Sequence, residues 1–253
     1  MSLAASGFLA ALLLMLGVWL ASLAYRDASL VDRFWGAGFV LLAWVYWLVA
    51  GSPAAGFLPV LAVSLWGGRL SLYLSWRNWG HGEDYRYREM RETHGARFPL
   101  VSLVTVFLLQ GLIMWLVAMP LLPAASAASL QPAWLLLGVL LWAVGFAWEA
   151  IGDWQMARFK ANPANKGQVM DRGLWRYSRH PNYFGEIVLW WGFYLMAVAA
   201  GGWWTIFGPA LMTFLLVRVS GVALLEKKLN ETRPAYRDYV QRTNALLPAP
   251  PRR

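Results

Sequence analysis

The 253-residue chain lacks cysteine, and it has only three histidines, at positions 81, 94 and 180. Without cysteine there is no disulfide, no thiolate nucleophile and no cysteine metal site. The histidines are too scattered for the helical two-histidine motif of zinc enzymes, so we expect no metal site. The GxGxxG and P-loop signatures of soluble nucleotide folds are also missing. Any nucleotide would therefore have to be bound by helices and loops.

Hydrophobic residues make up 59% of the chain, and 17 residues are tryptophan. A membrane-spanning helix needs roughly 20 apolar residues, and helices satisfy their own backbone hydrogen bonds in lipid. The sequence therefore predicts an all-α integral membrane protein with seven transmembrane helices and a single membrane domain over residues 1–253. The predicted spans cover about 3–25, 34–50, 57–76, 99–122, 132–155, 183–200 and 203–226.

Positive charge is concentrated on one side of this pattern. Twenty of the 22 lysines and arginines lie in residues 26–33, 77–97, 158–179 and 227–253. Basic loops face the cytoplasm, so we expect the N-terminus outside and the C-terminus in the cytoplasm. The same rule accounts for the net charge of +9 without nucleic acid as a partner. The first span lacks a basic leading region, which favours a retained helix over a cleaved signal. The cysteine-free, compact sequence suggests a bacterial inner membrane.

Ionisable residues inside apolar stretches are costly and usually face a cavity or a partner. Glu149 and Asp153 are four residues apart, on one face of a predicted helix. They either pair with Arg69 or Arg218, or line a polar cavity open to the cytoplasm. Four carboxylates in the apolar stretches outnumber these two arginines, which favours a bound ligand.

Asp32 directly precedes the second apolar stretch. It is either part of a solvated turn or, if buried, a carboxyl with a raised pKa that acts as a proton donor. The segment 83–88 mixes acids, arginines and tyrosines. It is either a solvated loop or a site for a phosphate-rich ligand, because arginine binds phosphate through two parallel hydrogen bonds.

The most informative motif is RGLWRYSRHPNYFGEIVLWWG at residues 172–192. Pro181 suits a helix start, Asn182 a helix cap, and Gly185 a close approach to the helix. Glu186 then lies about one turn inside. A helix N-terminus favours anions, so the motif indicates an anion cradle, or more simply a charged loop and a capped helix. The basic side chains before it are Arg176, Arg179 and His180.

The RGLWRYSRHPNYFGE run, the WWG after it and a tail ending in Leu-Leu-Pro resemble the C-terminal domain of the steroid 5-alpha-reductase family, especially its bacterial branch of unknown-function members. The resemblance covers about 140–250, and extends weakly over 83–87 and 29–36. It implies a membrane enzyme that uses NADPH at a site facing the cytoplasm. Residues 1–125 would form the substrate pocket and residues 126–253 would bind the cofactor.

The implied reaction is hydride transfer to the β-carbon of an enone lipid, such as a 3-oxo-Δ4 steroid, with an acid polarising the carbonyl. The partners expected are this lipid-soluble substrate and membrane lipid, with no protein partner required. Asp32 is the preferred acid, with Tyr85 and Tyr87 as rivals. The residues expected at the cofactor are Arg69, Arg86, Arg88, Glu149, Asp153, Lys160, Lys166, Arg176, Tyr177, Arg179, His180, Asn182 and Glu186.

This chain also departs from the family pattern. Asp32 stands in the region of a Gln-Glu pair, Trp66 in that of a tyrosine, and Glu149 takes the place of an asparagine. These departures bear on the substrate and the acid more than on the cofactor.

Two other classes remain open from the sequence. The RHPxY start is shared with isoprenylcysteine carboxyl methyltransferases and phospholipid methyltransferases, which use S-adenosylmethionine. Such an enzyme needs little phosphate binding, so the arginines near 77–91 favour the reductase. The other alternative is a non-catalytic protein that holds sterol or quinone lipids among its spans.

Overall fold

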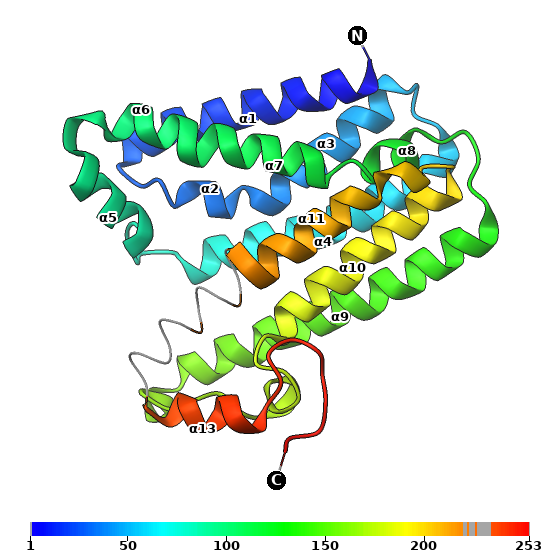
Figure 1. Cartoon of the computed structure of the whole chain (residues 1–253). Coiled ribbons are helices and arrows are strands. Elements are labelled where there is room, and N and C mark those ends of the chain that lie inside the picture. The colour runs from blue at the N-terminus through cyan, green and yellow to red at the C-terminus, as the bar shows by residue number, and fades with distance from the viewer. Residues whose placement is uncertain (1, 220–221, 223–225, 227–233, 253) are drawn as a thin grey trace. The chain divides into compact units, whose positions relative to one another are not determined.

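The structure is a computed structural model that describes residues 2–219, 222, 226 and 234–252. Every regular element in these residues is helical (Figure 1). The chain divides into two compact units. Unit 1 comprises Met1–Gln131 and Ala197–Gly208, and unit 2 comprises Pro132–Met196 and Pro209–Arg253.

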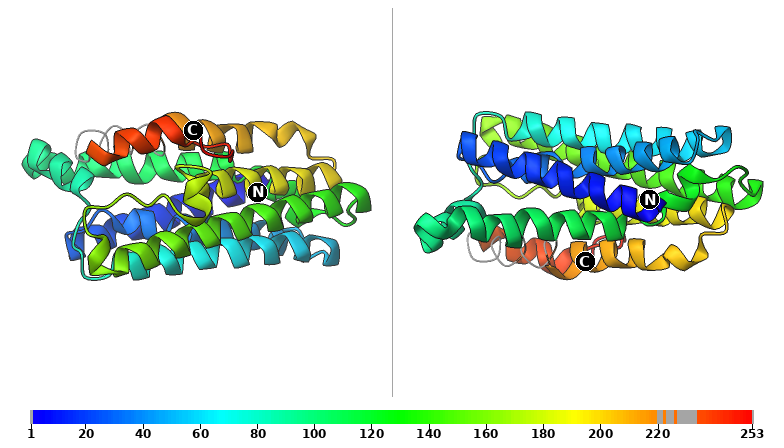
Figure 2. Two further views of the ribbon diagram at one scale, coloured as in Figure 1. Left: turned by 90° about the horizontal axis from the view of Figure 1, so that it is seen from below. Right: turned by 90° about the horizontal axis from the view of Figure 1, so that it is seen from above.

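Unit 1 is built on four apolar helices: α1 (Leu3–Tyr25), α3 (Trp35–Val49), α4 (Phe57–Arg77) and α7 (Leu109–Val117). Helix α3 packs against α1 and α4, and α1 packs against α7. The right view of Figure 2 shows α1 running alongside the α6–α7 segment. Shorter elements complete the unit: α2 (Leu30–Arg33), α5 (Tyr85–His94), α6 (Phe98–Ser102), η3 (Leu103–Leu108), α8 (Leu121–Ser126) and the 3-10 turns η1 (Ala54–Gly56), η2 (Gly95–Arg97) and η6 (Trp203–Ile206).

Glycine allows the α3 and α4 backbones to touch. A Cβ at Gly36 or Gly67 would overlap the carbonyl oxygen of the other residue. Phe39 and Trp66 lie beside this crossing, are both completely buried, and place their ring centroids 5.7 Å apart. Of the neighbouring pair Gly67 and Gly68, only Gly67 makes this close contact. A Cβ at Gly68 would meet nothing within 4 Å.

Unit 2 is organised by α9 (Pro132–Ala161) and most of α10 (Pro181–Ala199). The remaining elements are η4 (Pro163–Asn165), η5 (Gly173–Arg176), most of α11 (Phe207–Phe214), η7 (Leu215–Val219) and α13 (Pro234–Arg242). Helices α9 and α10 run side by side (Figure 1). Small residues bring their backbones into contact: Gly138, Gly145 and Gly152 on α9, and Gly185 and Gly192 on α10.

Two helical stretches have π-type hydrogen bonding, η3 between α6 and α7 and η7 after α11. A π turn holds more residues than an α turn and occurs mostly as an isolated insertion in an α-helix. In unit 1, η3 is part of a nearly continuous helical run from Tyr85 to Val117.

Within the residues that the structure describes, four helices are long and apolar enough to cross a membrane, which is consistent with a membrane protein. They are Leu3–Tyr25, Ala54–Arg77, Tyr85–Val117 and Pro132–Ala161. Two of the other predicted spans correspond to shorter apolar helices, Trp35–Val49 and Trp203–Val219, and most of 220–226 lies outside the described residues. Helix α10 has 19 residues but is not among the four. Seven spans and their orientation therefore stay predictions.

Candidate functional site

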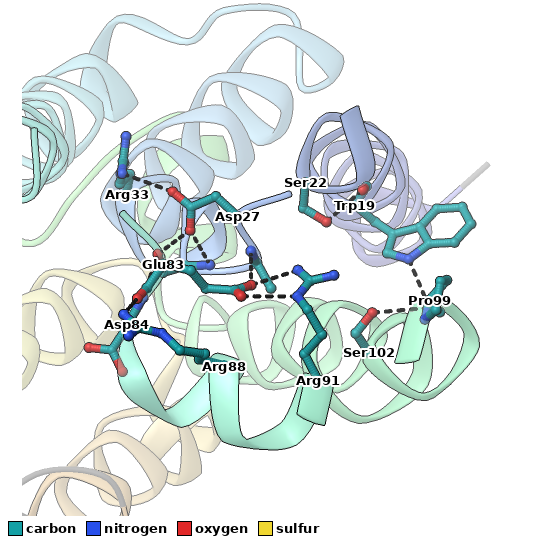
Figure 3. A network of polar contacts seen from close by, with 12 residues as sticks. Trp19, Ser22, Asp27, Arg33, Glu83, Asp84, Arg88, Arg91, Pro99 and Ser102 are labelled. Carbon is teal, nitrogen blue, oxygen red and sulfur yellow. Dashed lines mark hydrogen bonds and ion pairs between the residues drawn. The ribbon is translucent and has the colours of Figure 1, made fainter. Parts of the chain in front are cut away.

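A network of polar contacts joins the turn after α1 to the start of α5 (Figure 3). The Glu83 carboxylate accepts from the Ala28 amide at 2.8 Å and from Arg91 through two hydrogen bonds of 2.7 and 3.0 Å. Burial opposes the charge on Glu83, but these donors outweigh it and hold the pKa of that carboxylate below its usual value. Glu83 is therefore an ionised anchor for the turn.

Four further hydrogen bonds hold this turn in place. Asp27 accepts from the Ser29 amide at 3.0 Å and from Arg33 at 3.1 Å. The Ser29 hydroxyl accepts from the Asp84 amide at 3.3 Å. Asp84 in turn caps α5 by accepting from the Arg86 amide at 3.0 Å. Residues 27–29 and 83–84 are thus fixed together, a few residues before Asp32 and Tyr87.

The acid cluster consists of Asp32, Arg86, Tyr87 and Gln110. Arg86 donates to one oxygen of Asp32 at 2.8 Å, and the Tyr87 hydroxyl donates to the other at 3.0 Å. The Gln110 side chain lies near the Tyr87 hydroxyl. The structure therefore brings Asp32, the preferred candidate for the acid, into contact with Tyr87, one of the two alternative candidates. Tyr87 is buried, whereas Tyr85 is 37% exposed at the first position of α5.

The environment of Asp32 suits proton transfer. Loss of hydration raises the pKa of Asp32 above its ordinary value, against the opposing effects of the Arg86 charge and the Tyr87 hydroxyl. The Asp32 side chain retains 26% exposure and the Arg86 side chain 38%. The cluster therefore combines a carboxyl of raised pKa with partial access to solvent.

The helix-pair cluster consists of Glu149 and Asp153 on α9 and Asn182 and Glu186 on α10. The three carboxylates are 2–8% exposed, and the Asn182 amide donates to Asp153 at 3.3 Å. The Gly145–Gly185 contact explains this placement, because it brings the two helix backbones together beside these residues. Carboxylates and an amide oxygen accept hydrogen bonds, so the cluster fits the hydroxyl and amide groups of a nucleotide cofactor.

Arg179 and His180, which the sequence assigns to the cofactor, hold the C-terminal tail in place. Arg179 is 8% exposed and contacts Glu226 at 2.8 Å and the Val240 carbonyl at 3.1 Å. It also donates to the Thr243 carbonyl. His180 lies 3.1 Å from the same Glu226 oxygen. Most hydrogen-bond donors of the Arg179 side chain are thus bonded to acceptors within the protein.

The other predicted cofactor residues are not gathered at either cluster by any described contact. Arg69 belongs to α4 in unit 1, and its guanidinium lies 6.0 Å from the Tyr73 ring centroid. Arg88 donates to the Glu83 carbonyl at 2.9 Å and is otherwise exposed. Four more are exposed in unit 2: Lys160, Lys166, Arg176 and Tyr177.

Three features of the site have little or no signal in the expectations drawn from the sequence. Gln110 was not singled out, because a lone amide in an apolar stretch has no distinctive pattern. The contact between α9 and α10 had a readable signal in the seven-residue spacing of Gly138, Gly145 and Gly152. Glu226 is one of the four carboxylates in the apolar stretches, but its partner Arg179 lies 47 residues away in the chain.

Residues 18–243 match the family described as "Protein of unknown function (DUF1295)". The chain belongs to this family. Its assignment to the steroid 5-alpha-reductase family, based on the RHPNYFGE run, is therefore wrong. The run spans only residues 179–186, whereas the matching family covers residues 18–243. A local motif is thus a weaker indicator of family than a match over most of the chain.

Curated relatives leave the activity open. An uncharacterized protein of Schizosaccharomyces pombe is 28% identical over 262 aligned residues, covering 91% of this chain and 75% of that protein. A probable O-methyltransferase, ustE of Ustilaginoidea virens, is 34% identical over 92 residues, covering 36% of this chain and 31% of that protein. No solved structure matches the chain.

Proposed function

We propose that this protein is a membrane oxidoreductase that uses NADPH to reduce the C=C bond of an enone lipid, such as a 3-oxo-Δ4 steroid. The observation that carries the proposal is the hydrogen bond of 3.0 Å between the buried Tyr87 hydroxyl and the partly buried Asp32 carboxyl. A shielded acid beside a buried hydroxyl is suited to polarising a carbonyl group in an apolar substrate.

The pair would act on the carbonyl oxygen and supply the proton. NADPH, when bound, supplies the hydride that adds to the β-carbon of the enone. Asp32 or Tyr87 donates a hydrogen bond to the carbonyl oxygen as negative charge develops there, which is worth about 3–4 kcal/mol when the donor is well placed. One proton then reaches the α-carbon, so the C=C bond becomes a single bond. Arg86 stabilises the Asp32 carboxylate left behind.

The helix-pair cluster is the proposed cofactor site. Asn182 and Asp153 would accept from cofactor hydroxyl groups, and Glu149 and Glu186 would add further acceptors. The exposed side chain of Lys166, also in unit 2, carries positive charge that phosphates require. Arg179 and His180 would contribute indirectly by holding the tail against the start of α10.

A binding comparison tests the class of cofactor. Protein purified in detergent is mixed with NADPH or with S-adenosylmethionine, and the thermal midpoint and the nucleotide fluorescence are recorded. We expect a higher midpoint and a fluorescence change with NADPH alone. A response to S-adenosylmethionine alone would overturn the proposal. A screen of 3-oxo-Δ4 steroids for NADPH oxidation then follows.

A membrane methyltransferase that uses S-adenosylmethionine is the second candidate. Two observations favour it: the partial similarity to a probable O-methyltransferase, and the three buried carboxylates of the helix-pair cluster. S-adenosylmethionine carries a sulfonium and an amino group, both positive, which buried carboxylates attract. The arginines of unit 1 and unit 2 favour NADPH instead, because its phosphates are anionic.

We further propose seven membrane spans with the N-terminus outside and the cofactor site facing the cytoplasm of a bacterial inner membrane. The supports are the one-sided distribution of basic residues and the three additional apolar helices Trp35–Val49, Pro181–Ala199 and Trp203–Val219. Because the chain has no cysteine, single cysteines report topology without background labelling.

The exposed positions Ala54 and Ala164 serve this purpose, since they lie in connections predicted on opposite sides. In intact cells, a membrane-impermeant maleimide should label Ala54→Cys after outer-membrane permeabilisation. It should label Ala164→Cys only after the inner membrane is opened. The reverse pattern, or labelling of both from outside, would contradict the proposed topology. The unmodified chain is the control and should not be labelled.

A further inference from the structure

Unit 2 contains a cavity of about 370 Å³ between the loop before α10 and the C-terminal tail. Its walls include Asp171, Arg172, Arg176, Tyr239, Arg242 and Thr243. Hydrogen bonds fix these walls in place. Tyr239 donates to the Trp175 carbonyl, Thr243 donates to the Arg176 carbonyl at 3.4 Å, and the Arg252 amide donates to the Arg242 carbonyl at 2.8 Å. The cavity is thus part of the folded tail.

The side chains around this cavity leave positive charge without a matching anion. Arg172 and Arg176 form no side-chain hydrogen bond or ion pair with any residue that the structure describes. Arg242 and Asp171 approach to 4.0 Å, but both are about half exposed, so their attraction is weak. Three guanidinium groups face one carboxylate, which is the arrangement that a phosphate group complements.

A second groove of about 590 Å³ shares Arg172 and Gly173 with the first cavity. Its other walls include Trp154, Arg158, Phe159 and Met170, and the Arg158 guanidinium lies 5.5 Å from the Trp154 ring centroid. A polar cavity that adjoins an aromatic and aliphatic groove fits a ligand with a charged head and an apolar body.

The position of the groove on α9 indicates where such a ligand comes from. The 30 residues of α9 span about 45 Å, whereas the hydrocarbon core of a bilayer is about 30 Å thick. The apolar part of α9 begins at Pro132, so about the last ten residues extend past the hydrocarbon. Trp154 and Arg158 lie in that portion, where aromatic and basic side chains meet lipid headgroups.

We propose that the cavity lined by Arg172, Arg176 and Arg242 binds the phosphate headgroup of an anionic membrane phospholipid, whose glycerol and acyl portion lies along the groove of Trp154 and Phe159. Unlike the cofactor assignment, this site rests on Arg172 and Arg242, which have no part in the proposed redox chemistry. Arginine pockets at a membrane surface select anionic lipids by the same charge complementarity.

Native mass spectrometry of the full chain in an uncharged detergent tests the proposal. The probes are short-chain phosphatidic acid, phosphatidylcholine with the same acyl chains, and inorganic pyrophosphate. We expect phosphatidic acid to bind at least ten-fold more tightly than phosphatidylcholine. Arg172→Gln and Arg242→Gln should each weaken its binding about ten-fold. Arg237→Gln, an exposed site on the same helix as Arg242, removes the same charge outside the cavity and should leave binding unchanged.

The other outcomes overturn the lipid assignment. Equal binding of the two lipids, or an equal loss in Arg237→Gln, would mean general attraction to a basic protein. Pyrophosphate that binds as tightly as phosphatidic acid, with the same dependence on Arg172 and Arg242, would identify a soluble phosphate ligand instead.

Arg172→Lys keeps the charge but loses the geometry that forms two parallel hydrogen bonds, so it should restore only part of the affinity. Helical circular dichroism of each variant shows that the loss is not caused by unfolding.

Discussion

Gly145 and Gly185 face each other across α9 and α10: a Cβ added to either one would lie 2.6 Å from the carbonyl oxygen of the other. The two helices meet here through backbone atoms alone. Glu149 lies one turn beyond Gly145, and Glu186 directly follows Gly185. The glycines therefore determine how closely the buried carboxylates of the helix-pair cluster approach.

Replacing Gly185 by alanine should destabilise the protein by about 1–3 kcal/mol, because the methyl group has only backbone to displace. Thermal unfolding in detergent measures the effect. Gly68→Ala is the matched control, since it lies in a helix and its Cβ would meet nothing within 4 Å. It should be neutral or slightly stabilising, because alanine favours helix more than glycine does. An unchanged midpoint for Gly185→Ala would mean that the helices do not pack as described.

Asp32→Asn should abolish enone reduction while leaving NADPH binding unchanged, because an amide cannot release a proton in the required range. The raised pKa of Asp32 keeps its protonated form present to higher pH than for an ordinary aspartate. If this form donates the proton, kcat/KM should fall as pH rises through that pKa. Steady-state rates over a pH series measure this fall. Asp238→Asn, at an exposed site on α13, is the control. Undiminished turnover by Asp32→Asn would transfer the acid role to Tyr87.

Asn182→Ala and Glu186→Ala should weaken NADPH binding about ten-fold or more, because each removes a polar group from the helix-pair cluster. Nucleotide fluorescence titration gives the affinity. Glu92→Ala, at an exposed site on α5, serves as the charge control. Wild-type affinity in both cluster variants would rule out this part of the proposed cofactor site.

Glu226→Gln should loosen the attachment of α13. Burial opposes ionisation of Glu226, but hydrogen bonds from His180 and Arg179 outweigh it and lower its pKa from 4.5 to about 2. The group therefore stabilises the fold fully above its unfolded pKa, and this stabilisation is lost as pH falls from 4.5 towards about 2. The shift corresponds to at most about 3 kcal/mol.

Hydrogen exchange of peptides from 234–242 measures this attachment. In the unmodified chain, the exchange rate corrected for the intrinsic effect of pH should rise as pH falls from 4.5 towards about 2. In Glu226→Gln it should already be several-fold faster at neutral pH and lose that pH dependence. Glu92→Gln is the control, and an equal acceleration there would show that the effect is not specific to the tail.

The sequence predicted local structure well where one signal dominated. The first span was placed at 3–25 and α1 runs from Leu3 to Tyr25, because an uninterrupted apolar run ends at Arg26, which takes a left-handed conformation. The span predicted at 132–155 continues to Ala161, since 156–161 consists mostly of good helix formers. A hydropathy pattern therefore locates the apolar part of a helix, but not the residue at which the helix ends.

The site was predicted only in part, because pairing between distant residues depends on the fold. Asp32 and Tyr87 were both candidates, yet nothing in the sequence showed that they meet across 55 positions. Arg179 was expected at a phosphate because it precedes a helix start, and no local pattern revealed Glu226 as its partner. Residue type indicated candidate groups for chemistry, and the fold decided which of them already have a partner within the protein.

The π-type stretch at Leu103–Leu108 ends two residues before Gln110, the residue that completes the acid cluster. Each residue of an α-helix advances about 100° around the axis, so a single extra residue rotates everything after it by that angle. Deleting one residue from this stretch would convert it to ordinary α-helix and turn Gln110 away from Tyr87. The length of this segment is therefore under a constraint that amino-acid identity does not reveal: substitutions among its apolar residues are tolerable, whereas a one-residue gap is not.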